Sequence, residues 1–143
     1  MSRPVSPWLV LLAAIAAIEG IGLVGYAIFD IVQGLRVGLT GPEEVSNLPA
    51  LLLQIVIFAV LGVAGLAIAW GWWRAKYAAR APFILGQLLA LVVGVPIAQN
   101  LETTQRVVGT GLVVLAVVGI VASLLPPVTR AIVPADETGS AKG

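Results

Sequence analysis

Residues 8–31 read WLVLLAAIAAIEGIGLVGYAIFDI, a run in which only Glu19 and Asp30 are charged. At about 1.5 Å of rise per residue, roughly 20 apolar residues are enough to cross a hydrocarbon core about 30 Å thick. The run is therefore long enough to form a transmembrane helix. Glu19 follows Trp8 by 11 positions, or roughly 16 Å, so its carboxyl group is predicted to lie near the middle of the bilayer.

The composition of the whole chain also indicates a membrane protein. Of its 143 residues, 59% are hydrophobic and 10% are charged, whereas soluble domains carry about 25% charged residues. So few charged side chains cannot cover a surface that faces water, and most of the exterior must contact lipid. The net charge is +1, and no basic stripe is interleaved with aromatic residues, so we expect no nucleic-acid partner.

The residue types restrict the chemistry that is available to the chain. The sequence contains no cysteine and no histidine, which excludes disulfides, thiol chemistry and Cys/His metal sites. The hydroxyl residues Thr103, Thr104 and Ser123 lack a base partner, so no arrangement for a nucleophile is visible. We therefore expect no catalytic residues, no metal, no cofactor and no enzymatic activity.

Three further apolar segments follow the first. The four predicted transmembrane helices span about 8–31, 48–72, 82–98 and 107–125. In lipid every backbone polar group must be paired within its own element, and these long continuous apolar runs do not alternate as barrel strands do. We therefore predict an all-α polytopic membrane protein. Its four transmembrane helices form one antiparallel bundle within residues 1–130, followed by a flexible polar cytoplasmic tail over residues 131–143.

The distribution of Lys and Arg predicts the orientation of the chain. With four spans, the N-terminus, the loop 73–81 and the tail lie on one side of the membrane. That side carries Arg3, Arg74, Lys76, Arg80, Arg130 and Lys142. The other side carries only Arg36 and Arg106. Basic residues accumulate on the cytoplasmic side, so both termini are predicted to be cytoplasmic. An excess of Arg over Lys, with abundant Ala, Val, Leu and Gly, is typical of a high-GC bacterial genome, so we expect a bacterial inner membrane.

The aromatic residues at the predicted inner boundary agree with this orientation. Trp8, Trp70, Trp72 and Trp73 all fall at that boundary, where an aromatic belt is expected. Arg74, Lys76 and Arg80 lie beside the last two of these tryptophans, which favours contact with anionic lipid headgroups.

Glu19 requires compensation, because a carboxylate at the bilayer centre costs at least ~2.5 kcal/mol. Depth counting places no polar side chain of the other spans at its level. Gln87 lies a few residues toward the inner face and Gln54 a few residues toward the outer face. No Lys or Arg lies within a predicted span, so we expect Glu19 to be largely protonated at neutral pH. Two interpretations remain open. A neutral Glu19 hydrogen-bonds to Gln87, Gln54, a backbone carbonyl or another chain, or it cycles a proton or binds a cationic substrate.

Glycines and polar side chains follow Glu19 in the sequence at a regular helical spacing. Glu19, Gly22, Tyr26 and Asp30 recur at i, i+3, i+7 and i+11, so they share one helix face, which is predicted to point into the bundle, a subunit interface or a water-filled cavity. The stretch from Gly20 to Gly25 also spells GxGxxG. A dinucleotide-binding motif requires a strand before it and a helix after it, whereas this one lies inside a single apolar run. Close packing between helices is the favoured interpretation.

A second polar set lies at the predicted outer rim of the bundle. Its members are Asp30, Arg36, Gln99, Asn100 and Arg106, together with Gln33, Glu102 and Gln105. We interpret it mainly as a solvated rim of helix ends and loops, since such positions usually face water.

Two resemblances follow from these motifs. The chain resembles small four-span integral membrane proteins common in actinobacteria at three stretches: Gly94-Val95-Pro96, Val107-Val108-Gly109 and the segment from Leu124 to Arg130. That family has no assigned activity, so the resemblance implies topology alone. The stretch from Ala17 to Gly22 is similar to the first-helix motif of the small multidrug resistance exporters. That resemblance implies that Glu19 binds protons and cationic drugs alternately within a dimer. The aromatic, glycine-rich third-helix motif of that family is absent from residues 83–100.

The sequence thus favours a non-enzymatic interaction or accessory subunit, which self-associates or joins a larger membrane complex. Glu19 and the small-residue face of the first helix are predicted to make that contact. The alternative is a proton-coupled exporter of small cationic compounds that uses Glu19.

Overall fold

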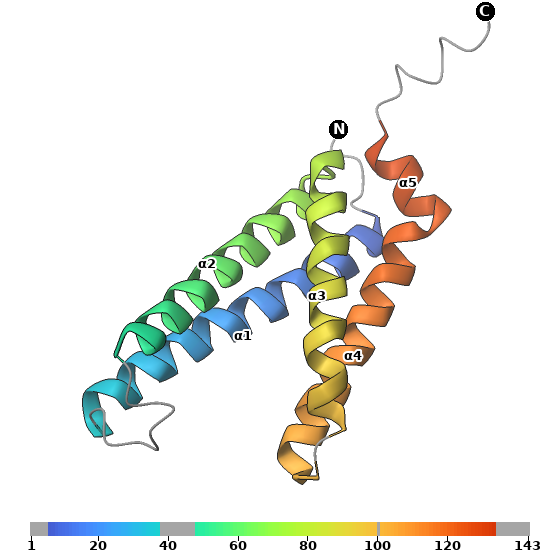
Figure 1. Ribbon diagram of the computed structural model, residues 1–143. Coiled ribbons are helices and arrows are strands. Elements are labelled where there is room, and N and C mark those ends of the chain that lie inside the picture. The colour runs from blue at the N-terminus through green and yellow to red at the C-terminus, as the bar shows by residue number, and fades with distance from the viewer. Residues whose placement is uncertain (1–5, 38–47, 100, 134–143) are drawn as a thin grey trace, which may run out of the picture. The chain divides into compact units, whose positions relative to one another are not determined.

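The computed structural model describes residues 6–37, 48–99 and 101–133. These residues form α1 (Pro7–Val37), α2 (Leu48–Trp73), the 3-10 turn η1 (Tyr77–Ala79), α3 (Arg80–Ala98), α4 (Thr103–Leu124) and α5 (Pro126–Ile132) (Figure 1). No strand occurs among them. Four helical stretches are long and apolar enough to cross a membrane: Pro7–Arg36, Leu48–Trp73, Tyr77–Ala98 and Thr103–Leu124. The predicted all-α polytopic membrane fold is confirmed.

The helices extend further than the apolar runs that predicted them. α1 continues past Ile31 to Val37, and α4 begins at Thr103 rather than near Val107. Hydropathy detects only the part of a helix that faces lipid. Once a helix is nucleated, each further residue adds a backbone hydrogen bond at little cost, so polar ends remain helical.

The Pro126-Pro127 pair ends one helix and begins another. α4 stops at Leu124, and Leu125 takes the extended conformation (φ −64°, ψ 140°) that a residue before proline favours. α5 then starts on the prolines themselves, whose missing N–H groups are not needed in a first turn. Its residues Val128 and Ile132 are buried, so the beginning of the predicted tail is packed. Residues 134–143 of that tail lie outside the described residues.

The chain divides into two units. Unit 2 is Ala16–Ala67, which holds most of α1 and α2, and unit 1 combines Met1–Ile15 with Ile68–Gly143. In unit 2, a ladder of contacts aligns α1 antiparallel to α2: Gly20 lies against Leu66, Tyr26 against Phe58, Asp30 against Gln54 and Gly34 against Leu51. The two residue numbers of each pair add to nearly the same value, as one antiparallel register requires.

The backbones of α1 and α2 come closest at two glycines. A Cβ built on Gly20 would lie 2.8 Å from the carbonyl oxygen of Gly62 and 2.9 Å from the amide nitrogen of Leu66. A Cβ on Gly62 would lie 2.9 Å from the amide nitrogen of Val24. No other residue fits at either position without separating the helices. Membrane helices associate through such contacts, because lipid provides no hydrophobic force between them.

Unit 1 is built on the α3–α4 hairpin. Gly109 of α4 lies against the backbone of Ile97 and Ala98, with a built Cβ 2.8 Å from the Cα of Ala98. Trp72 at the end of α2 is fully buried and meets Phe83 of α3 edge-on, with ring centroids 5.5 Å apart. The other buried apolar residues of this unit are Leu9, Leu12, Ala13, Ile15, Ala69, Ala79, Ala116, Ala122, Val128 and Ile132.

The end of α2 is closed by a Schellman turn. The amide of Lys76 donates to the carbonyl of Gly71, and the amide of Ala75 donates to the carbonyl of Trp72, both at 2.9 Å. Ala75 occupies the left-handed position of this motif, with φ of 52°. That position usually holds glycine, because a Cβ is unfavourable there.

Candidate functional site

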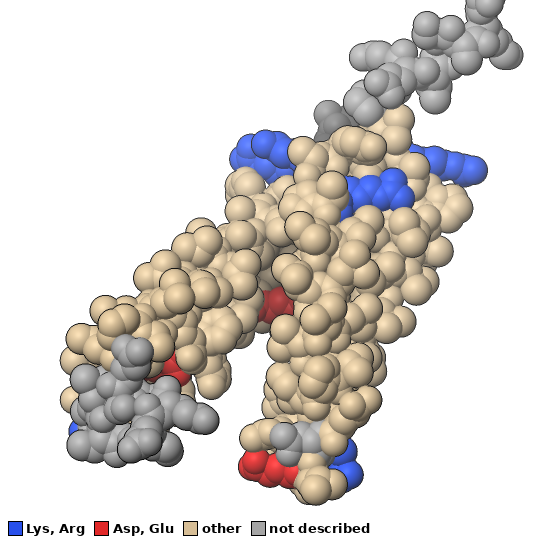
Figure 2. Space-filling view, in the orientation of Figure 1, with Lys and Arg blue, Asp and Glu red and all other residues tan. Residues whose placement is uncertain are grey.

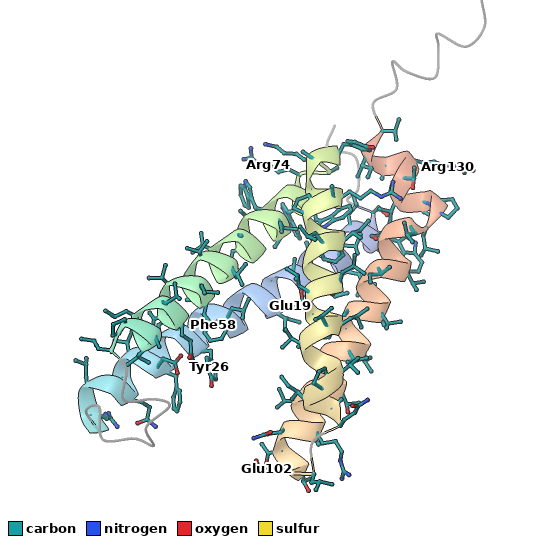
Figure 3. The ribbon with its side chains drawn as sticks, in the orientation of Figure 1. Glu19, Tyr26, Phe58, Arg74, Glu102 and Arg130 are labelled. Atoms are coloured by element: carbon teal, nitrogen blue, oxygen red, sulfur yellow. The ribbon has the colours of Figure 1, made fainter. Side chains whose placement is uncertain are left out.

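Glu19 lies on α1 in unit 2, deep within the apolar span Pro7–Arg36 (Figure 3). The residue is half-buried, and its Oε1 atom is shielded from the exterior. It is followed directly by Gly20, where α1 and α2 nearly touch. The carboxyl group is therefore attached to one of the most tightly packed parts of the unit.

An aromatic and polar ladder lies along the hairpin beyond Glu19. Tyr26 meets the ring of Phe58 edge-on at 5.3 Å and the ring of Phe29 at 6.1 Å. One turn further, Gln54 Nε2 donates a hydrogen bond of 2.9 Å to Asp30 Oδ2. Tyr26 and Asp30, two of the predicted site residues, therefore contact α2. Figure 3 labels the Tyr26–Phe58 pair.

Gln54 is the partner of Asp30. The helix register places Glu19 opposite the neighbourhood of Leu66. Gln54 lies 12 residues before Leu66 on α2, which corresponds to about 18 Å along the helix. Depth counting from the sequence had suggested Gln54 as a hydrogen-bond partner of Glu19, and the register separates them.

Gly22 does not belong to the α1–α2 contact. It is exposed, and no heavy atom of the described residues comes within 4 Å of a Cβ built on it, apart from its own chain neighbours and nearby helix backbone. Gly20 and Gly22 are two residues apart, so they point roughly 200° away from each other. The GxGxxG motif therefore serves two opposite faces: Gly20 packs on α2, while Gly22 and Gly25 are open.

Gln87 occupies the core of unit 1. Its side chain is 1% exposed and packs against Gly119, where a built Cβ would lie 3.2 Å from the amide Cδ and Oε1 atoms of Gln87. One turn along α4, the buried Ser123 donates its hydroxyl hydrogen to the carbonyl of Ile120 at 2.8 Å. Sequence reasoning had not connected Gly119 with Gln87. A small residue facing a buried amide becomes visible only when the α3–α4 register is known.

The predicted outer-rim set is divided between the two units. Half-buried Asp30 and exposed Arg36 belong to unit 2, whereas exposed Gln99 and Arg106 belong to the α3–α4 hairpin of unit 1. Asn100 lies outside the described residues. Arg106 lies in the first turn of α4, and its carbonyl accepts a hydrogen bond of 2.7 Å from the Thr110 hydroxyl. Arg36, Gln99 and Arg106 lie at helix ends, whereas Asp30 lies seven residues before the end of α1.

Comparison of the chain with protein-family models, with curated proteins and with solved structures found no match. The resemblances of its motifs to the actinobacterial membrane proteins and to the multidrug exporters therefore remain hypotheses, and function has to be argued from the residues of the chain itself.

Proposed function

We propose that the protein is a non-enzymatic interaction or accessory subunit of a bacterial inner membrane, with both termini in the cytoplasm, that self-associates through α1. The observation that carries this proposal is the open glycine pair Gly22 and Gly25 on the side of α1 that faces away from Gly20. A second copy of the same chain is the partner we favour, and a different subunit of a larger membrane complex is the alternative.

The open glycines lie on a regular seam. Ile18, Gly22, Gly25 and Phe29 are spaced by four, three and four residues, which places them along one line of an α-helix. Ile18 and Phe29 are 58% and 54% exposed. Together they form a line of two glycines flanked by two large apolar side chains, a pattern that allows two membrane helices to approach closely.

Energetics also favour a partner for this seam. Glycine within a helix is less favourable than alanine by about 1 kcal/mol. Gly20 offsets that cost by allowing contact with α2, whereas Gly22 and Gly25 receive no such contact within the described chain. Helix–helix contact with another chain would provide the missing compensation.

The test compares two glycines that are equally open. Gly22→Leu is expected to weaken the dimer by tenfold or more, since a leucine side chain keeps the two helices apart. Gly86→Leu on α3 is the matched control, because Gly86 is also exposed and, beyond its own helix backbone and chain neighbours, no described residue lies within 4 Å of a Cβ built on it. The dimer fraction is measured by native mass spectrometry and by crosslinking in lipid nanodiscs. Unchanged dimerisation of Gly22→Leu, or equal loss in Gly86→Leu, would remove self-association through this seam.

A proton-coupled exporter of small cationic compounds is the second candidate. It is favoured by the position of Glu19, a half-buried carboxyl group deep within an apolar span. Such groups mark ion or proton pathways in many membrane proteins. The two functions differ in their response to Glu19→Gln. An amide cannot cycle a proton, so an exporter would lose pH-driven flux in proteoliposomes, whereas a subunit with a structural Glu19 would keep its assembly.

A further inference from the structure

Four of the five basic residues described in unit 1 lie at the same end of that unit, and Arg106 lies at the other end. Arg74 follows the end of α2, Lys76 precedes η1, Arg80 begins α3, and Arg130 lies in the last turn of α5. Figure 2 shows the Lys and Arg side chains at this end of the unit. We call Arg74, Lys76, Arg80 and Arg130 the basic rim. Arg130 joins it only because α4 returns antiparallel to α3 and α5 follows.

The basic rim has no acidic counterpart among the described residues of its unit. Glu102 is the acidic residue described there, and it lies at the opposite end of the α3–α4 hairpin (Figure 3). The 19 residues of α3 separate the two ends by about 28 Å. This distance exceeds the Debye length of about 8 Å at physiological salt, so Glu102 does not neutralise the rim.

The rim is attached to a packed frame. Gly71 lets α2 approach η1 so closely that a built Cβ would lie 2.8 Å from the Cβ of Ala79. Fully buried Trp72 packs on Phe83, which holds the end of α2 against the start of α3. Arg74 and Arg80 are therefore held at defined places by the core of the unit.

α5 orients Arg130 in the same way. Val128 and Ile132 are buried at 0% and 4% exposure, and Arg130 lies between them on the exposed side. Residues two positions apart on a helix point to nearly opposite sides, so burial of Val128 and Ile132 turns Arg130 outward. Its position in the last turn is also favourable for a positive charge.

Exposed aromatic residues adjoin two of the cations in the sequence, since Trp73 precedes Arg74 and Tyr77 follows Lys76. Trp70, Trp73 and Tyr77 are between 53% and 60% exposed. The guanidinium carbon of Arg74 lies 4.7 Å from the centre of the Trp70 ring, a cation–π distance that holds the side chain along the aromatic surface. Exposed Trp and Tyr at the end of apolar spans occupy the level of lipid headgroups. The cations therefore lie at the depth of lipid phosphates.

We propose that the basic rim binds the phosphodiester headgroups of anionic phospholipids. The occupant is a membrane lipid, since exposed apolar helix surface continues directly below the rim and exposed aromatic rings border it. Phosphate oxygens accept hydrogen bonds from Arg and Lys, and guanidinium groups bind them in bidentate fashion. This inference is independent of the proposed self-association.

The experiment titrates the full-length protein with lipid and counts bound molecules by native mass spectrometry. Phosphatidylglycerol is expected to bind at least tenfold more tightly than phosphatidylcholine. Removal of one rim cation, as in Arg80→Gln or Arg130→Gln, is expected to weaken phosphatidylglycerol binding about fivefold, because each basic residue near a lipid surface contributes ~1 kcal/mol. Arg130→Lys keeps the charge and should restore most of the binding. Far-UV circular dichroism checks that helicity is unchanged.

Arg106→Gln is the control, since Arg106 is exposed and lies at the opposite end of the same hairpin. It is expected to change phosphatidylglycerol binding by less than twofold. Equal binding of the two lipids would overturn the proposal, and so would equal losses in Arg106→Gln and Arg130→Gln. Glycerol phosphate or inorganic phosphate that displaces the lipid at similar concentration would instead assign the rim to a soluble phosphate and refute a lipid site.

Discussion

Gly20→Ala and Gly22→Ala alter two glycines of the same motif, yet they are expected to change stability in opposite directions. Replacing glycine by alanine inside a helix contributes about 1 kcal/mol of favourable propensity at either position. Within a single copy of the chain nothing at Gly22 opposes this gain, because no described residue beyond the glycine's own helix backbone and chain neighbours lies within 4 Å of a new Cβ. Gly22→Ala should therefore stabilise the monomeric chain by up to ~1 kcal/mol.

At Gly20 the new methyl group meets the backbone of α2. It would lie 2.8 Å from the carbonyl oxygen of Gly62, whereas carbon–oxygen contacts in proteins ordinarily measure about 3.3–3.6 Å. The helices must separate by roughly half an ångström, because backbone atoms cannot rotate away as a side chain can. Overpacking of this kind costs about 1–3 kcal/mol, so Gly20→Ala should be less stable than Gly22→Ala by a similar amount.

The assay is equilibrium unfolding in mixed micelles, followed by far-UV circular dichroism of the full chain. The comparison of two Gly→Ala variants cancels the propensity term and leaves the contact between α1 and α2. Gly62→Ala should resemble Gly20→Ala, and the double variant should cost less than the sum, since both changes disturb one contact. Equal stability of Gly20→Ala and Gly22→Ala would refute the close approach of the two helices.

Three further experiments test other parts of the structure. Ala75→Gly should raise the free energy of unfolding by ~1 kcal/mol, since Ala75 holds a left-handed conformation with φ of 52°; a lower melting temperature would contradict the Schellman turn. Gly109→Ala should destabilise the α3–α4 hairpin by about 1–3 kcal/mol, because its Cβ would meet backbone atoms of α3. Gly111→Ala should not destabilise the hairpin, because Gly111 is open among the described residues. Thermal unfolding of the two variants compares their stabilities. A double-mutant cycle with Asp30→Leu and Gln54→Leu should give a coupling energy of about 0.6 kcal/mol, the average for such pairs between membrane helices. A coupling energy of zero would contradict the 2.9 Å hydrogen bond between the two side chains.

The membrane class and the four spans follow from the linear sequence. Burial of a continuous apolar run in lipid and internal pairing of its backbone depend on neighbouring residues alone, so hydropathy located each helix to within a few residues. Errors occurred where a helix continued into polar residues, as at the end of α1, or where it restarted on prolines, as in α5. Neither a polar helix end nor a helix that restarts on prolines changes the hydropathy of the apolar run from which the span was predicted.

The location of Glu19 deep in a span was predictable, because depth follows from counting residues. The residues that surround Glu19 in the folded protein were not predictable. Depth alone made Gln54 a possible partner of Glu19, but the antiparallel register pairs Gln54 with Asp30. A register relates segments that are far apart in the sequence, and no local pattern encodes it.

The glycine motif shows most clearly where sequence and tertiary structure divide. Its residues predict close helix packing, which Gly20 makes with Gly62 and Leu66, while Gly22 and Gly25 remain open. In a soluble protein, apolar periodicity would distinguish the packed face of a helix from the exposed one. In lipid both faces are apolar, so only the contact between α1 and α2 decides which glycine is packed and which is available to a partner.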